Sequence, residues 1–225
     1  MRAIFILSLF FVLLIPLSAQ SHVHKLNTPF EQLKVVGNIH LLLLPAETNY
    51  LEFETSSFPE SLTVEQDLSE LVIKSKTELK QKEAIEVKLY LNSLSGLEII
   101  RGAVVRSGDT LRFKTLNLRV DTGAKAEFFL VCDALKARVN QGSDIILSGH
   151  TRSLEVTANT VANFLGYEFQ AENAFVKSAT GAQVKVKVSG VLNATASGKA
   201  FIGYDGDPDK KEFSTSLGGK ISPRI

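Results

Sequence analysis

Three aspartates near the C-terminus are the residues most suggestive of metal chemistry. Asp205, Asp207 and Asp209 stand at alternate positions in the segment DGDPD, and alternating carboxylates open one kind of calcium-binding loop. Such a loop also needs Gly at its sixth position and Glu at its twelfth. Here two lysines follow, and Pro208 interrupts the segment. We therefore interpret the three aspartates as a solvated turn and expect neither a metal site nor a cofactor.

No arrangement of nucleophile, base and acid typical of catalysis stands out in the sequence. It contains no nucleophile elbow, Cys/His pair, zinc-ligand spacing or phosphate loop. The single cysteine, Cys132, lies in the apolar run AEFFLVCD, which favours a core or interface position over a reactive thiol. We expect a protein without catalytic residues that is not an enzyme. The alternative is a polysaccharide-active enzyme with a β-helical fold.

The first residues of the chain have the pattern of a secretory signal peptide. Arg2 precedes an apolar run, and the small residues Ser18 and Ala19 follow it. The alternative, an uncleaved membrane anchor, needs about 20 apolar residues, and this run is shorter. We expect residues 1–19 to be removed and the mature chain to be exported, with a periplasmic or cell-surface location.

The four histidines do not form an obvious ligand set. If cleavage follows Ala19, His22 becomes the third residue of the mature chain, where imidazole, amine and amide nitrogens could hold Cu²⁺ or Ni²⁺. We favour the simpler interpretation, in which His22 and His24 lie in a polar tail. His40, in an expected strand, and His150, at an expected turn, have no ligand partner at a usable spacing.

Asp109, Thr110 and Leu111 resemble the acceptor for O-glycosylation in envelope proteins of some Gram-negative bacteria. An ordinary turn between two strands explains the same three residues. Both interpretations of Thr110 stay open at the level of sequence.

Charge excludes one class of partner. Without Arg2 the 25 basic residues fall to 24, which equals the 24 acidic ones. A neutral chain has no overall field that attracts nucleic acid, so we expect no nucleic-acid partner. Residues 20–225 are enough for one domain with its own core.

A repeat organises residues 96–225. Turn residues recur at steps of 19, 19, 20 and 17, at Gly123, Gly142, Val161, Gly181 and Gly198, and the series extends to Gly102 and Gly218. Three positions after each of the five stands an apolar residue: Ala126, Ile145, Phe164, Val184 and Phe201. Within a repeat, apolar residues alternate with the period of a strand. Such a unit buries its apolar face only against its neighbours. The sequence therefore predicts an all-β protein, a right-handed parallel β-solenoid with two short strands in each rung.

Residues 25–95 have a different pattern. Their short strands are separated by turn residues at closer spacing, as in a β-meander. We expect these strands to flank or cap the solenoid, because an uncovered end exposes unpaired backbone groups. The boundary falls between Asn92 and Gly96.

The repeat also predicts an outward row of apolar residues. Four and six positions after the turn residues stand Phe129, Ile146, Leu165, Tyr167, Ile202 and Tyr204, interrupted by Lys185 and Lys187. One interpretation is that the N-terminal strands cover this row, because continuous exposed apolar strips are uncommon on monomers. The other is a binding face for a partner, a glycan or a second copy, with aromatic anchors.

Several segments together resemble a known family. They are the opening FEQLKVVGNIHLLL, the segment IEVKLYLNSLSGLEII, the small-residue corners, and the closing pattern of Tyr204, Gly206 and Pro208. On these segments the mature chain is similar to the head GIN domain family of putative auto-transporter adhesins. His40 and Val161 depart from the pattern of that family. The resemblance implies a β-helical fold and a cell-envelope location.

Together these features predict an exported, non-enzymatic envelope module that binds an envelope protein or a glycan, or associates with itself. A polysaccharide-active enzyme and a purely structural envelope protein are the alternatives.

Overall fold

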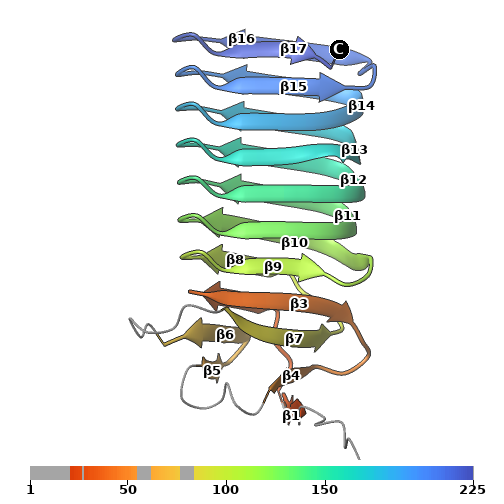
Figure 1. Cartoon of the computed structure of the whole chain (residues 1–225). Helices are drawn as coiled ribbons and strands as arrows, with labels where there is room; N and C mark the ends of the chain where they lie inside the picture. Colours follow the sequence, from red (N-terminus) through yellow and green to blue (C-terminus); the bar gives the residue numbers. More distant parts are fainter. Residues whose placement is uncertain (1–20, 27, 55–61, 77–83, 225) are drawn as a thin grey trace, which may run out of the picture.

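The computed structural model describes residues 21–26, 28–54, 62–76 and 84–224, so the expected signal peptide lies outside the described residues. Within these ranges the regular elements are all strands (Figure 1). They are β1 (Ser21–Lys25), β2 (Gln32–Val36), β3 (Ile39–Pro45), β4 (Tyr50–Glu54), β5 (Leu62–Asp67), β6 (Glu70–Ser75), β7 (Ile85–Leu91), β8 (Gly96–Ile100), β9 (Val104–Ser107), β10 (Leu111–Asp121), β11 (Lys125–Val139), β12 (Asp144–Ala158), β13 (Asn163–Ser178), β14 (Gln183–Ala196), β15 (Phe201–Asp205), β16 (Lys210–Thr215) and β17 (Lys220–Pro223). None of the described residues forms a helix able to span a membrane.

The strands from β8 onward stack as the rungs of a parallel β-solenoid, which confirms the predicted fold class (Figure 1). Each long strand bends once, so that its first half lies on one face of the solenoid and its second half on the other. A single strand of 15 residues, β11, therefore replaces the two short strands expected in that rung. We call the turning points of the long strands the bends. The tight turns that join one rung to the next are the corners.

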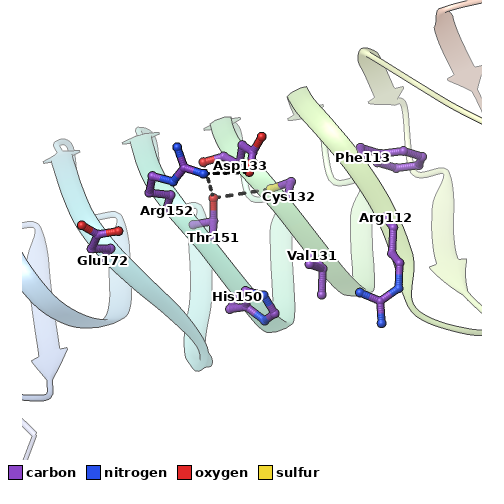
Figure 2. Close-up of a pocket in the computed structure, with 9 residues that line it drawn as sticks. All are labelled: Arg112, Phe113, Val131, Cys132, Asp133, His150, Thr151, Arg152 and Glu172. Carbon is purple, nitrogen blue, oxygen red and sulfur yellow. Dashed lines mark hydrogen bonds and ion pairs between the residues drawn. The ribbon is translucent and has the colours of Figure 1, made fainter.

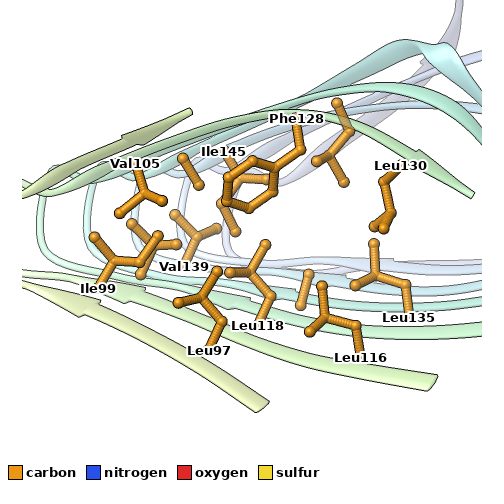
Figure 3. Close-up of a cluster of buried hydrophobic side chains, with 14 of the residues drawn as sticks. Leu97, Ile99, Val105, Leu116, Leu118, Phe128, Leu130, Leu135, Val139 and Ile145 are labelled. Carbon is orange, nitrogen blue, oxygen red and sulfur yellow. The ribbon is translucent and has the colours of Figure 1, made fainter. Parts of the chain in front are cut away.

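The inward side chains of the two faces meet in one continuous core (Figure 3). Ala126 pairs in register with Ile145, Ile145 with Phe164, and Phe164 with Val184. All four are fully buried, as the repeat predicts. Burial of apolar surface at about 25 cal/mol per Å² is the main stabilising contribution of this column.

Each corner contains two consecutive residues in the left-handed region. In one corner these are Thr122 (φ 57°) and Gly123 (φ 69°). The second residue donates its N–H to the carbonyl of the first residue of the next corner, as Gly123 does to Gln141 at 3.0 Å. These bonds stack the corners in the same order as the strands.

The corner at Gly198 corrects one prediction. Here glycine comes first and Lys199 (φ 62°) second, and it is Lys199 that donates its N–H to Leu217, at 3.0 Å. The inward column is therefore counted from Lys199, and Val184 pairs with the fully buried Ile202 instead of with Phe201. The sequence places both residues on the wrong side, because glycine adopts either left-handed position equally well.

Val161 is a β-branched residue in a left-handed corner position, and its replacement by glycine is expected to stabilise the protein. Its φ is 58° and its side chain is 66% exposed. A left-handed L-residue costs about 1–2 kcal/mol, and glycine in the same position loses more chain entropy on folding. We expect Val161→Gly to raise the free energy of unfolding by about 1 kcal/mol in chemical denaturation. The control is Val104→Gly, at a strand position with ordinary φ, which should lower the free energy of unfolding. If Val161→Gly left the free energy of unfolding unchanged, Val161 would not be strained.

The N-terminal strands close one end of the solenoid. The β2 and β3 strands pair in parallel with β8 and β9 on one side and with β6 and β7 on the other. Strands β4, β1 and β5 then pair antiparallel at the outer edge. Of the two expected arrangements, capping is therefore confirmed, and the cap combines parallel rungs with antiparallel strands.

The expected polar tail around His22 and His24 is a strand instead. Every residue of β1 pairs antiparallel with β4, which otherwise would present an open edge. Covering such an edge satisfies its backbone groups, and this accounts for the ordered conformation.

The C-terminal end of the solenoid carries a charged residue in the inward column. Lys211 of β16 pairs in register with the buried Leu192 and forms an ion pair with Asp207 at 2.8 Å. All six residues of β16 are exposed. Charges that point inward at an edge strand discourage the addition of further strands, so this end is protected against edge pairing.

Candidate functional site

The predicted outward row is present on the first face of the solenoid, but it contains four of the six predicted residues. Phe129 is 58% exposed, and Ile146, Leu165 and Tyr167 are half-buried. Ile146 and Leu165 are paired in register on β12 and β13. We call these four residues the outer apolar face.

Ile202 and Tyr204 do not belong to this face. Ile202 is fully buried, and Tyr204 pairs in register with the inward Val186. The ring of Tyr204 packs against the core and lies 5.4 Å from the ring of Phe213. A shift of one residue at the preceding corner reverses the side of every residue in the strand, which explains the error.

Two cations hold the ring of Tyr167 at the end of the outer apolar face. The Arg224 guanidinium lies 4.7 Å from the ring centroid and the Lys185 ammonium 5.8 Å from it. The pKa of the Tyr167 hydroxyl is raised, chiefly by burial and further by Asp205, and Arg224 offsets this only in part. The phenol is therefore a neutral hydrogen-bond donor at neutral pH. Lys185 pairs in register with Leu165, so lysine ends the apolar row where the sequence predicts it.

The described N-terminal strands do not cover the outer apolar face. They continue the ladder end-on, because β3 pairs with β9 along the solenoid axis (Figure 1). The interpretation in which these strands pack over the outward row is therefore wrong for the described part of the chain. Because β2, β3, β6 and β7 all pair within this axial ladder, none of these four strands lies over the face.

A second feature, which the sequence did not indicate, is a hollow on the bend side of the solenoid (Figure 2). Its volume is about 480 Å³, and its walls come from the bends of β10, β11, β12 and β13. We call it the bend hollow, and it is lined by Arg112, Phe113, Val131, Cys132, Asp133, His150, Thr151, Arg152 and Glu172. Register brings these residues together, since Arg112 pairs with Val131 and Val131 with His150. Arg112, Val131 and His150 are spaced 19 residues apart in the sequence, and this spacing is the signal that could have predicted the hollow.

Hydrogen bonds fix one wall of the bend hollow. Arg152 forms an ion pair with Asp133 at 3.3 Å on its neighbouring strand. The Thr151 hydroxyl lies 3.1 Å from the carbonyl of Ser153 and accepts from the Cys132 thiol at 3.5 Å. Cys132 is buried, as predicted, and burial raises the pKa of its thiol, a change that its bond to Thr151 only partly opposes. A protonated, buried thiol is a poor nucleophile.

We expect Cys132 to resist alkylation in the folded protein. Iodoacetamide at mildly alkaline pH should leave the native chain unmodified and label the denatured chain fully, as measured by mass spectrometry. The variant His150→Cys places a thiol at a solvent-exposed position of the same hollow, and this thiol should react rapidly with iodoacetamide. Equal labelling of native and denatured wild-type protein would show that Cys132 is reactive.

The other residues considered for chemistry lie apart from the bend hollow. Asp207 accepts a hydrogen bond from Lys211 at 2.8 Å, which lowers the pKa of its carboxyl. Asp205 accepts from the N–H of Gly206 at 2.8 Å, in keeping with a turn. His40 lies 2.8 Å from a carboxylate oxygen of Glu86. Among the described residues, no group of three or more His, Cys, Asp or Glu could hold a metal ion.

Thr110 lies in the loop between β9 and β10 and is partly exposed. Its N–H donates to the side chain of Asp109 at 2.6 Å, which gives the acceptor segment a turn conformation. Glycosylation of Thr110 stays a prediction. Intact mass of protein purified from its own host tests it, since a mass equal to the processed polypeptide would exclude the glycan.

Comparison with solved structures shows the same fold. The chain is similar to a putative adhesin from Bacteroides fragilis at 14% identity and a TM-score of 0.81, covering 92% of this chain and 98% of that one. It is also similar to a putative lipid binding protein from Parabacteroides distasonis, at 16% identity, a TM-score of 0.65 and the same two coverages. A putative adhesin from Parabacteroides merdae matches at 16% identity and a TM-score of 0.68, covering 92% of this chain and 96% of that one.

Family comparison agrees with the structural one. Among curated proteins, none matches the sequence significantly. The family model of the head GIN domain matches residues 29–208, which is most of the chain. The chain therefore belongs to the head GIN domain family of putative auto-transporter adhesins.

Proposed function

We propose that the protein is an exported, non-enzymatic binding module of the cell envelope, and that its outer apolar face docks another envelope protein. The family description and the structural neighbours support an adhesin-like role. The signal-peptide pattern of residues 1–19 supports export.

The observation that carries the proposal is the exposure of Phe129 diagonally opposite the apolar pair Ile146 and Leu165; its own partner in register on β12 is Ser148. The Phe129 side chain is 58% exposed and lies on the same face as Ile146 and Leu165. An exposed aromatic residue beside other apolar side chains is typical of protein interfaces, where a few buried aromatic residues carry most of the binding energy. Tyr167, whose ring is contacted by Lys185 and Arg224, adds a second aromatic group.

The bend hollow lacks a free pair of carboxylates for glycoside hydrolysis. A typical glycosidase needs two acidic side chains on either side of the scissile bond. The bend hollow contains Asp133 and Glu172, but Asp133 is already paired with Arg152 at 3.3 Å. Among the residues that line the bend hollow, Glu172 is the one carboxylate with no ion pair in the described part of the chain, so this hollow favours a binding role.

Capture from an envelope extract tests the proposal. The immobilised mature chain should retain a specific envelope protein, and Phe129→Ser or Leu165→Ser should reduce its recovery by about tenfold. Phe175→Ser is the matched control, because Phe175 is 52% exposed and lies on the second half of β13, on the opposite face. Each variant should keep the wild-type melting temperature within a few degrees.

Two results would contradict the proposal. One is equal recovery of envelope proteins by wild type and Phe129→Ser. The other is an equal loss with Phe129→Ser and Phe175→Ser, which would indicate unspecific adsorption. Retention of a glycan instead of a protein, abolished by Phe129→Ser, would reassign the partner of the face.

A further inference from the structure

The bend hollow continues into a second hollow. This neighbour has a volume of about 560 Å³ and shares Arg112 and Phe113 with the bend hollow. Its other walls include Glu47, Asn92 and Thr110, which follow or precede strands of the N-terminal cap and the first rung. The two hollows therefore form one groove on the bend side, which we call the bend groove.

The bend groove is long enough for a chain-like ligand. It extends from the end of β7 to β13, across the pairings β7–β3, β3–β9, β9–β11, β11–β12 and β12–β13. Neighbouring strands lie about 4.8 Å apart, so the groove spans roughly 24 Å. Each half has a volume within the range of small-ligand sites, about 300–1,000 Å³.

Several polar side chains in the groove are free to bind a ligand. Among the described residues, the side chains of Arg112, His150 and Glu172 have no hydrogen-bond or ion-pair partner. Figure 2 shows Arg112 and His150 projecting in the same direction from separate bends. Guanidinium and carboxylate groups are planar and can each form a pair of parallel hydrogen bonds, which suits adjacent hydroxyl groups of a sugar ring.

The charges in the groove disfavour an anionic ligand. In the bend hollow, Arg112 and Arg152 are balanced by Asp133 and Glu172. The second hollow adds Glu47 and Asp109. A chain of carboxylates or sulfates would meet at least as many acidic as basic groups, whereas a neutral chain rich in hydroxyl groups would not be repelled.

The junction of the two hollows carries an aromatic ring. Phe113 is half-buried and packs against the core, so its ring is fixed in position. A fixed aromatic face is suited to contact the apolar face of a sugar ring. Peptides are commonly bound by strand addition to a free sheet edge, but the bend strands are paired on both sides, as β11 is with β10 and β12. The groove therefore favours a glycan over an extended peptide.

We propose that the bend groove binds a neutral oligosaccharide chain, with Phe113 as stacking platform and Arg112 and Glu172 as hydrogen-bonding groups. This site borders the outer apolar face, since Phe129 lies two residues before Val131 on β11, but it shares no lining residue with that face and does not depend on the docking function proposed for it.

Titration calorimetry with a panel of linear neutral hexasaccharides, built from glucose, mannose, xylose or galactose, tests the proposal. At least one should bind the mature chain. Arg112→Ala and Glu172→Gln should each weaken that binding by about tenfold, the effect of losing a hydrogen bond to a charged group. Phe113→Leu keeps an apolar side chain in the core and removes the aromatic face, so it should weaken binding to a similar extent.

Two controls separate this site from the outer apolar face. Arg138→Ala removes an exposed arginine from the second half of β11, outside the groove, and should leave sugar binding unchanged. Phe129→Ser should also leave it unchanged. The proposal is overturned if no neutral hexasaccharide binds, if only a polyuronic chain or a peptide binds, or if Phe129→Ser abolishes binding while Arg112→Ala does not.

Discussion

Ile145→Asp is expected to unfold the middle rungs of the solenoid. Ile145 is fully buried and stacks in register between Ala126 and Phe164. The substitution removes a buried apolar side chain and places a carboxylate where no described residue offers a partner. The combined cost is about 5 kcal/mol, which is comparable to the whole stability of many domains. Thermal unfolding followed by circular dichroism should show a large fall in melting temperature or no folded state.

The neighbouring residue gives a matched control. Ile146→Asp introduces the same side chain one position further on, where the chain points outward and the residue is half-buried. The free energy of unfolding of this variant should lie within about 1 kcal/mol of that of the wild type. If both variants melt alike, Ile145 does not point into the core and the register derived from the corners is wrong.

Gly149→Ala is expected to have the second-largest effect on stability. Gly149 lies within β12 at φ 117°, a conformation that L-residues rarely adopt. An added Cβ would overlap the carbonyl oxygen of Leu130, its partner in register on β11. Backbone atoms in a ladder cannot move aside without loss of pairing, so we expect a loss of about 3 kcal/mol in the free energy of unfolding.

Gly142→Ala is the comparison that isolates the backbone overlap. Gly142 also has a positive φ, 68°, but an added Cβ there would meet no atom within 4 Å. Its replacement should cost only the left-handed strain, about 1 kcal/mol. Equal losses for the two variants in urea denaturation would show that Leu130 is not the cause.

The corner series illustrates how far sequence reasoning extends into the fold. Besides Gly218, the five residues Gly102, Gly123, Gly142, Val161 and Gly181 occupy the second left-handed position of their corners. Counting from the last four of them placed Ala126, Ile145, Phe164 and Val184 correctly in the core. The count failed where Gly198 takes the first left-handed position and Lys199 the second. Two of the six residues predicted for the outward row, Ile202 and Tyr204, were misplaced for that reason alone.

The bend hollow could not be derived in the same way. Corners have a local signature, because two consecutive left-handed residues favour glycine. The bend of β11 has none, because this strand passes from Phe129 through Cys132 to Leu135 without interruption. Its residues lie near Arg112 and His150 only because the rungs are stacked in register.

Sequence alone determined the strand period, the spacing of the corners up to Gly181 and the inward column from Ala126 to Val184, since these depend on short-range backbone geometry and on the burial of every second side chain. Tertiary structure decided the rest. The position of the bends, the end-on packing of β2, β3, β6 and β7, and the grouping of Arg112, His150 and Glu172 all depend on which strands pair. Pairing joins residues far apart in the chain, so its outcome is set by the packing of the whole core and leaves no mark in any single segment.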